Sequence, residues 1–113
     1  MTYREILNIE RFEMMEERLG IRINSINAEI SDSTDSDGEC SFNIRGEVLS
    51  LNGGNLDKTI ILKISLYDSL GKFTKLIEVY FFSHNFFGID VFESNYYHKG
   101  NDIDSIRILA VAA

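Results

Sequence analysis

Cysteine and long apolar runs are nearly missing from this sequence, and each absence excludes a class of protein. Cys40 is the only cysteine, so no disulfide can form within the chain. No stretch approaches the roughly 20 apolar residues that a membrane-spanning helix requires. The chain starts with a mixed, charged segment, whereas a secretory leader has an apolar stretch before its cleavage site. If Met1 is the native start, we expect a cytoplasmic location.

Basic residues are also in the minority. The chain has 11 Lys and Arg against 18 Asp and Glu, which gives a net charge of −7. Such a chain repels the phosphates of nucleic acids and the anionic surface of a membrane. Because the basic residues are scattered along the sequence, we expect neither nucleic acid nor membrane among the partners.

The bulk composition indicates one folded domain. A length of 113 residues fits a single domain over 1–113, with a core that is large enough to fold without disulfides or metals. The hydrophobic fraction of 44% is higher than that of disordered chains. Proline is absent, and seven of the eight glycines lie between apolar runs, where strand connections are expected.

The apolar runs alternate with a period of two, which is typical of strands with one buried face. The clearest strand is 59–68, whose inward residues are Ile60, Leu62, Ile64 and Leu66. A second strand, 72–82, has as its inward residues Phe73, Ile77, Val79 and Phe81. We predict a tight hairpin between the two strands, with Gly71 at positive φ.

Four further strands are predicted at 21–30, 41–51, 90–93 and 105–112. In 21–30 the apolar phase slips by one residue at Asn24-Ser25, which indicates a β-bulge. In 41–51, Gly46 indicates a bulge or a close approach of another backbone segment. The inward side chains of the other runs are expected to be Phe42, Ile44, Val48, Ile106, Ile108 and Ala110.

Residues 5–19 allow two interpretations. Asn8 could cap a short helix that ends at Gly20, with an apolar stripe made of Phe12, Met15 and Leu19. Alternatively, a first strand begins at Leu7 and Ile9 and bulges before Phe12 and Met14. We slightly favour the strand, because the edge of a sandwich requires one there.

Short strands with turns about every ten residues predict an all-β fold. We expect a two-layer immunoglobulin-like β-sandwich of about six to eight antiparallel strands, with a possible short N-terminal helix.

The end of the clearest strand resembles a known motif. Ile64-Ser65-Leu66-Tyr67-Asp68, followed by Gly71-Lys72, is similar to the motif of the FxLYD domains, with Ile64 in place of the phenylalanine. These domains are small bacterial immunoglobulin-like β-sandwiches. Segments 42–48 and 87–92 resemble an upstream and a later strand of the family, so the likeness covers about residues 40–109. The resemblance implies a fold and no particular activity.

An acidic loop, Ser31 to Glu39, is a candidate cation site. Calcium prefers several oxygen ligands on a flexible loop, and the candidates here are Asp32, Asp35 and Asp37. Asp35-x-Asp37-Gly38 matches the centre of an EF-hand loop, but Ile44 then replaces the glutamate that closes such a site. The other interpretation is a polar hairpin loop that turns at Asp37-Gly38. A calcium-responsive or small-ligand domain is therefore the alternative function, and no other cofactor is expected.

Aromatic residues are concentrated near the C-terminal end. Eight of the 13 aromatic residues lie within 80–97, and they include the adjacent pairs 81–82, 86–87 and 96–97. Neighbouring side chains in a strand point to opposite faces, so one member of each pair is exposed unless a loop covers it. Exposed aromatics mark interfaces. We therefore predict an interaction module that binds a protein partner or itself, with these interface candidates: Tyr80, Phe82, Phe86, Phe87, Tyr96 and Tyr97.

The two histidines, His84 and His98, are expected in solvated loops. With Cys40 they lack the close spacing that a zinc site would show. A hydrolase built on either histidine would need a nucleophile within about 3 Å, an orienting carboxylate and an oxyanion hole. We expect no enzymatic activity, and we interpret Cys40 as a small hydrophobic residue at the start of a strand.

Overall fold

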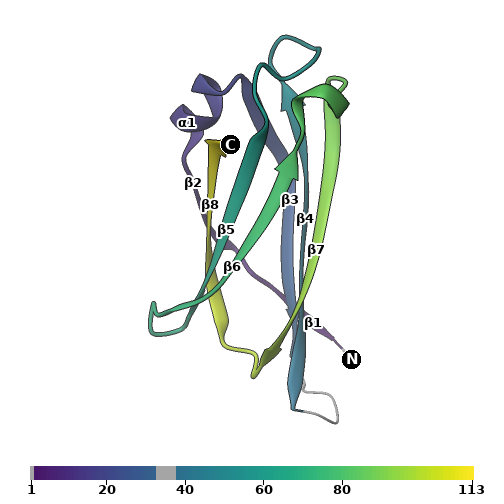
Figure 1. The fold of residues 1–113 in the computed structure, drawn as a ribbon. Helices are drawn as coiled ribbons and strands as arrows, with labels where there is room; N and C mark the ends of the chain where they lie inside the picture. The colour runs from purple at the N-terminus through teal and green to yellow at the C-terminus, as the bar shows by residue number, and fades with distance from the viewer. Residues whose placement is uncertain (1, 33–37) are drawn as a thin grey trace.

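The chain forms a two-layer β-sandwich (Figure 1). A computed structural model describes residues 2–32 and 38–113. The first sheet has the order β1-β3-β4-β7, formed by Tyr3–Glu5, Ile21–Ser31, Glu39–Ser50 and Ile89–Lys99. The second has the order β2-β8-β5-β6, formed by Asn8–Arg11, Ile103–Ala112, Ile60–Asp68 and Phe73–Phe81. The all-β sandwich predicted from the alternation is confirmed.

One strand pair differs from the antiparallel arrangement that we expected. β2 runs parallel to β8, from Asn8 opposite Ser105 to Arg11 opposite Ile108. The chain pairs with β3 as β1, passes between the sheets at the buried residue Ile6, and continues as β2 in the second sheet. Because β1 and β2 are successive parts of one extended segment, β2 keeps the direction that places it parallel to β8.

The N-terminal segment contains both of the alternatives that we considered. Strand β2 is followed by the short helix α1, Glu13–Arg18. The expected cap, Asn8, lies in the strand, and Phe12 occupies the N-cap position without a side-chain cap. The expected apolar stripe is also wrong at Met15, which is exposed, because the helix instead buries Glu16. Gly20, at φ +74°, follows the helix as predicted.

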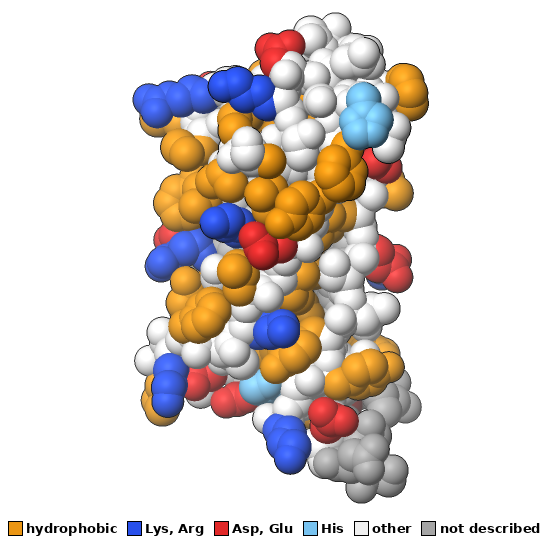
Figure 2. Space-filling view, viewed as in Figure 1, with side chains coloured by type: hydrophobic (Ala, Val, Ile, Leu, Met, Phe, Trp, Pro, Cys, Tyr) orange, Lys and Arg blue, Asp and Glu red, His pale blue; other side chains and the backbone are white. Residues whose placement is uncertain are grey.

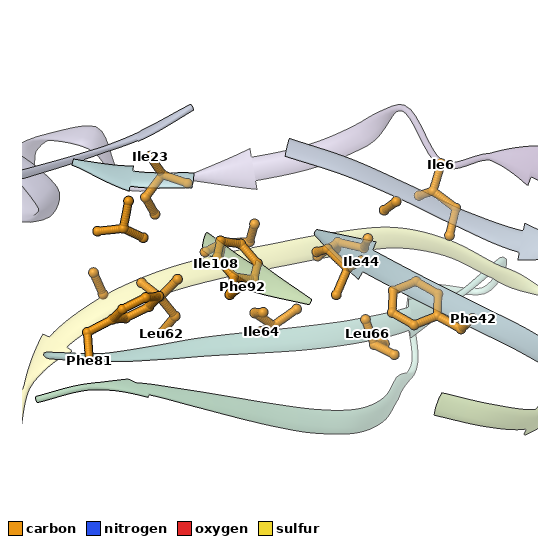
Figure 3. Packing of buried hydrophobic residues seen from close by; sticks show 14 of the residues in the cluster. Ile6, Ile23, Phe42, Ile44, Leu62, Ile64, Leu66, Phe81, Phe92 and Ile108 are labelled. Atoms are coloured by element: carbon orange, nitrogen blue, oxygen red, sulfur yellow. The ribbon is translucent and has the colours of Figure 1, made fainter. Parts of the chain in front are cut away.

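The core consists of the alternating residues of facing strands (Figure 3). The predicted inward residues of β5 are all at most 1% exposed: Ile60, Leu62, Ile64 and Leu66. Phe42 and Ile44 of β4 point toward them from the first sheet. Phe73 is the exception among the predicted inward residues. A register shift between Leu66 and Tyr67 leaves Phe73 half-exposed, and its ring packs edge-to-face on Tyr67 at 6.0 Å.

Two predicted backbone irregularities are present. The β3–β4 register shifts between Asn24 and Asn27, and Ser25 there has a φ of +56°. In the β5–β6 turn Gly71 has a φ of +78°, and its N–H donates to the Asp68 carbonyl. At Gly46 the carbonyl oxygen of Asn24 lies 3.5 Å from the position of an ideal Cβ, so backbone does approach closely, and the Phe92 ring, at 2.8 Å, lies closer still.

β7 is longer than the predicted strand 90–93. Its second half has polar or half-buried inward residues, at Ser94, Tyr96 and His98. The apolar alternation therefore stops at Phe92, although the pairing with β4 continues to Lys99.

Candidate functional site: an exposed aromatic surface

Three of the clustered phenylalanines belong to the core. Phe81, Phe86 and Phe92 are each at most 4% exposed. The Phe81 ring packs edge-to-face on the other two, with centroid distances of 6.1 Å to Phe86 and 6.3 Å to Phe92. Our interface assignment of Phe86 is therefore wrong: the chain turns inward after the short 3-10 helix η1, Ser83–Asn85, and the Phe86 ring fills the end of the sandwich.

The partners of these buried rings in the sequence are exposed. Phe82 follows the buried Phe81 and is half-exposed, while Phe87 follows Phe86 and is 78% exposed. The predicted divergence within adjacent aromatic pairs is thus confirmed for both pairs. It holds for the third pair as well, since Tyr97 is exposed and Tyr96 is half-buried.

Tyr80 and Phe82 form one aromatic surface at the end of β6. Their rings stack with a centroid distance of 6.1 Å and an interplanar angle of 23°. The His84 ring lies next to Phe82 as well, with a centroid distance of 6.0 Å and an interplanar angle of 46°. The backbone N–H of Ser83 donates to Oγ1 of Thr59 at 3.2 Å, which attaches this segment to the chain just before β5.

Apolar side chains of the neighbouring strands extend this surface. Across the outer face of the second sheet, Tyr80 is opposite Ile61, and Ile61 is opposite Val111. We call Ile61, Tyr80, Phe82 and Val111 the aromatic patch. Figure 2 shows hydrophobic side chains spread over the side of the molecule that carries β5 and β6. Sequence analysis did not include Ile61 and Val111 among the interface candidates, although both are apolar at outward positions of their strands.

The centre of the other outer face has a different composition. On the first sheet two cross-strand rows are entirely polar: Asn27, Arg45 and Glu93, then Glu29, Asn43 and Asn95. These residues surround a shallow hollow of about 280 Å³. A sheet face that meets water is expected to carry such residues.

The remaining exposed or half-buried interface candidates lie outside the aromatic patch. Tyr97 is opposite Ser41 near the end of β7, whereas Phe87 precedes the start of that strand. The Tyr96 ring faces β6, where Nζ of Lys75 lies 5.5 Å from its centroid. The six interface candidates thus do not form a single surface.

The acidic loop is only partly described. Asp32 is exposed, and its carboxylate accepts a hydrogen bond from the Thr2 hydroxyl. Asp35 and Asp37 lie outside the described residues. Within 2–32 and 38–113, no group of three or more His, Cys, Asp and Glu side chains is arranged to hold a metal ion. Calcium binding stays a prediction, which thermal melts with calcium and with a chelator would test.

His84 is exposed in the connection between β6 and β7, as predicted, whereas His98 lies in a strand and not in a loop. His84 is part of η1, and His98 is in β7, where its Nε2 lies 2.8 Å from Oδ1 of Asp102. Cys40 is opposite His98 in the β4–β7 register and is buried, as expected of a small hydrophobic residue. Among the described residues, neither histidine has a hydrogen bond to a serine, threonine or cysteine.

A buried ion pair is a feature that sequence analysis did not identify. Glu16 of α1 is 2% exposed, and its Oε1 lies 2.6 Å from an Nη of Arg11 in β2. The pair lies beside a hollow of about 250 Å³ between α1 and β3. Because the apolar pattern places Glu16 on no buried face, the sequence carries no signal for its burial.

Comparisons with known proteins give one weak similarity of fold. No protein-family model matches the chain, and no curated protein matches it. A solved structure of a putative beta-galactosidase from Bacteroides fragilis is similar over 83% of this chain, with a TM-score of 0.48 and 11% identity. The chain spans 16% of the length of that protein. Across residues 2–32 and 38–113, none of the helices has the length and apolarity to span a membrane.

Proposed function

We propose that this chain is a non-catalytic interaction module that binds a protein through the aromatic patch. The observation that carries the proposal is the contrast between the two outer faces. The first sheet presents polar rows at its centre and exposed apolar residues along β7, such as Ile89 and Val91. The second sheet presents an apolar row that crosses three strands, made of Tyr80, Ile61 and Val111. Apolar surface gains free energy when it leaves water, and contact with a partner supplies that gain.

The kind of side chain also supports a protein partner. Tyrosine and phenylalanine are enriched in the cores of protein interfaces and supply much of their binding energy. The Tyr80–Phe82 stack lies at the end of a paired strand and is attached by the Ser83–Thr59 hydrogen bond, so little order has to be gained on binding. We also propose that the sandwich is immunoglobulin-like, as the resemblance to the FxLYD domains implies.

A pair of matched variants tests this function. Phe82→Ser removes a half-exposed ring from the aromatic patch, and Tyr3→Ser removes a similarly exposed ring from β1. Both changes should alter the free energy of unfolding by less than about 1 kcal/mol, because surface substitutions have small effects. The self-association of each variant is measured by light scattering, and bound proteins are identified by mass spectrometry after affinity capture.

The expected result is an association that persists in Tyr3→Ser and is lost in Phe82→Ser. A strictly monomeric wild type that captures no protein in a Phe82-dependent manner contradicts the proposal. Tyr97→Ser serves as a second comparison, because it removes an exposed candidate ring outside the aromatic patch.

A further inference from the structure

Basic charge is concentrated in one part of this acidic chain. Residues 58–82, which contain β5 and β6, hold four of the 11 basic side chains but only two of the 18 acidic ones. The basic residues are Lys58, Lys63, Lys72 and Lys75. Residues 58–82 therefore have a net charge of +2, from four basic and two acidic residues, although Asp57 directly precedes them and the chain as a whole has a charge of −7.

The acidic residues of this segment form no ion pair with the lysines. The Asp68 carboxylate accepts hydrogen bonds from the backbone N–H groups of Leu70 and Lys72, at 2.9 and 2.8 Å, so it stabilises the turn. Glu78 is opposite Lys63 in the register but forms no ion pair with it. Among the described residues, none of the four lysines is paired with a carboxylate, whereas ion pairs do involve Arg4, Arg11 and Arg107.

Two of these lysines flank the aromatic patch. Lys63 follows Ile61 by two residues in β5, so the two side chains share the outer face roughly 7 Å apart. Lys58 comes just before β5, next to Thr59, which receives the hydrogen bond from Ser83. Figure 2 shows basic side chains among the hydrophobic ones on this side of the molecule. A partner that packs on the aromatic patch therefore lies close to the position of Lys63 on the outer face and to the backbone segment that carries Lys58.

Strand addition at β6 is not the way such a partner would bind. β6 is the last strand of its sheet, but Lys75 occupies an inward position, opposite Leu66. Its Nζ lies 5.5 Å from the Tyr96 ring centroid, at the seam between the two sheets. An inward-pointing lysine on an edge strand opposes pairing with another chain. The partner is therefore expected on the outer face and not at the edge.

A second copy of the chain is a poor occupant of this face. In a symmetric dimer the same surface meets itself, so the net positive charge of residues 58–82 would meet the same net charge on the other copy. Like charges across an interface weaken association. A nucleic acid is also disfavoured, because it carries a phosphate at every nucleotide and the remainder of the chain is strongly acidic.

We infer that the aromatic patch receives an acidic protein segment, whose apolar side chains pack on Tyr80 and Phe82 while its carboxylates pair with Lys58 and Lys63. This inference rests on the proposed function, since it names the chemistry of the partner at the same surface. The ion pairs supply specificity and orientation, and the apolar contacts supply most of the affinity.

Selection of peptides on the full chain tests the inference. A display library of random 16-residue peptides is selected on the wild type and counter-selected on Phe82→Ser, and the enriched peptides are synthesised. Their affinities are measured by fluorescence anisotropy for the wild type and for Lys58→Glu/Lys63→Glu. Lys99→Glu, an exposed lysine at the end of β7, is the control for a reversal of charge elsewhere.

The enriched peptides are expected to contain more Asp and Glu than the library and to bind Lys58→Glu/Lys63→Glu at least about tenfold more weakly. Their affinity for Lys99→Glu should stay within about twofold of their affinity for the wild type. Binding of the peptides to the wild type should weaken as the salt concentration rises. Peptides that depend on Phe82 but show no acidic excess would overturn the inference and leave the proposed function standing.

Three other results also decide the matter. If selection yields no peptide that depends on Phe82, both the inference and the proposed function are overturned. If a 20-nucleotide oligothymidylate displaces the peptides with comparable affinity, the occupant is a nucleic acid and the inference is wrong. If light scattering shows a wild-type dimer that Phe82→Ser abolishes, the occupant is a second copy.

Discussion

The contact between Gly46 and Phe92 should make Gly46→Ala destabilising although no backbone strain is involved. An ideal Cβ at Gly46 would lie 2.8 Å from both Cε1 and Cζ of Phe92, whereas carbon atoms prefer about 3.5–4.0 Å. The ring cannot move outward easily, because it is 4% exposed and packs against Phe81. Overpacking of this kind costs about 1–3 kcal/mol, and relief of the glycine's entropy in the unfolded state returns about 0.5–1 kcal/mol.

We therefore expect Gly46→Ala to lower the free energy of unfolding by about 1–2 kcal/mol. This loss corresponds to a decrease in Tm of roughly 4–8 °C for a domain of this size. Urea denaturation followed by circular dichroism measures the change. Gly54→Ala is the matched control, because the nearest atom to its Cβ, Oδ1 of Asn52, would be 3.7 Å away. The reasoning would be refuted if Gly46→Ala were as stable as the wild type. It would also be refuted if Gly46→Ala lowered the free energy of unfolding as much in a Phe92→Leu protein as in the wild type.

Three further predictions concern the fold. Arg11→Met should cost roughly 3 kcal/mol, because it leaves the buried Glu16 carboxylate unpaired, and Arg11→Met/Glu16→Met should be more stable than the single variant in urea titrations. Gly71→Ala should lower the free energy of unfolding by about 1–2 kcal/mol, because Gly71 has a φ of +78°. Gly71→Asn should lower it less, and equal losses in the two variants would contradict a purely backbone cause. Cys40, at 0% exposure, should react with a thiol reagent only when the protein unfolds, so rapid labelling in native buffer would disprove its burial.

Regular strands with one buried face could be predicted from the sequence. In β5 every second residue is apolar and buried, so the period, the facing and the hairpin at Gly71 were all correct. The bulge in β3 was also correct, because the apolar phase slips where the register shifts. Both features are local, and a pattern of a few residues determines each of them.

Features that depend on the meeting of distant segments could not be predicted. The burial of Phe86 depends on a ring contact with Phe81 and on the turn of η1, and neither alters the local pattern. The parallel pairing of β2 depends on where the chain crosses between the sheets at Ile6. The second half of β7 has polar inward residues at an open side of the sandwich, so no apolar alternation marks it as a strand.

Apolar residues at outward positions of the strands indicate where the surface makes contacts. A strand with one buried face needs apolar side chains only at its inward positions, so an apolar residue at an outward position adds nothing to the core. Ile61 and Val111 are such residues, and the register aligns both with Tyr80 in one row. Outward positions on the first sheet could have held the same residues, yet its central rows are polar. The exposed apolar residues on the outer face of the first sheet, such as Ile89 and Val91, lie along the single strand β7. The row through Tyr80 instead crosses three strands, and contact with a partner is the cause that we propose for it.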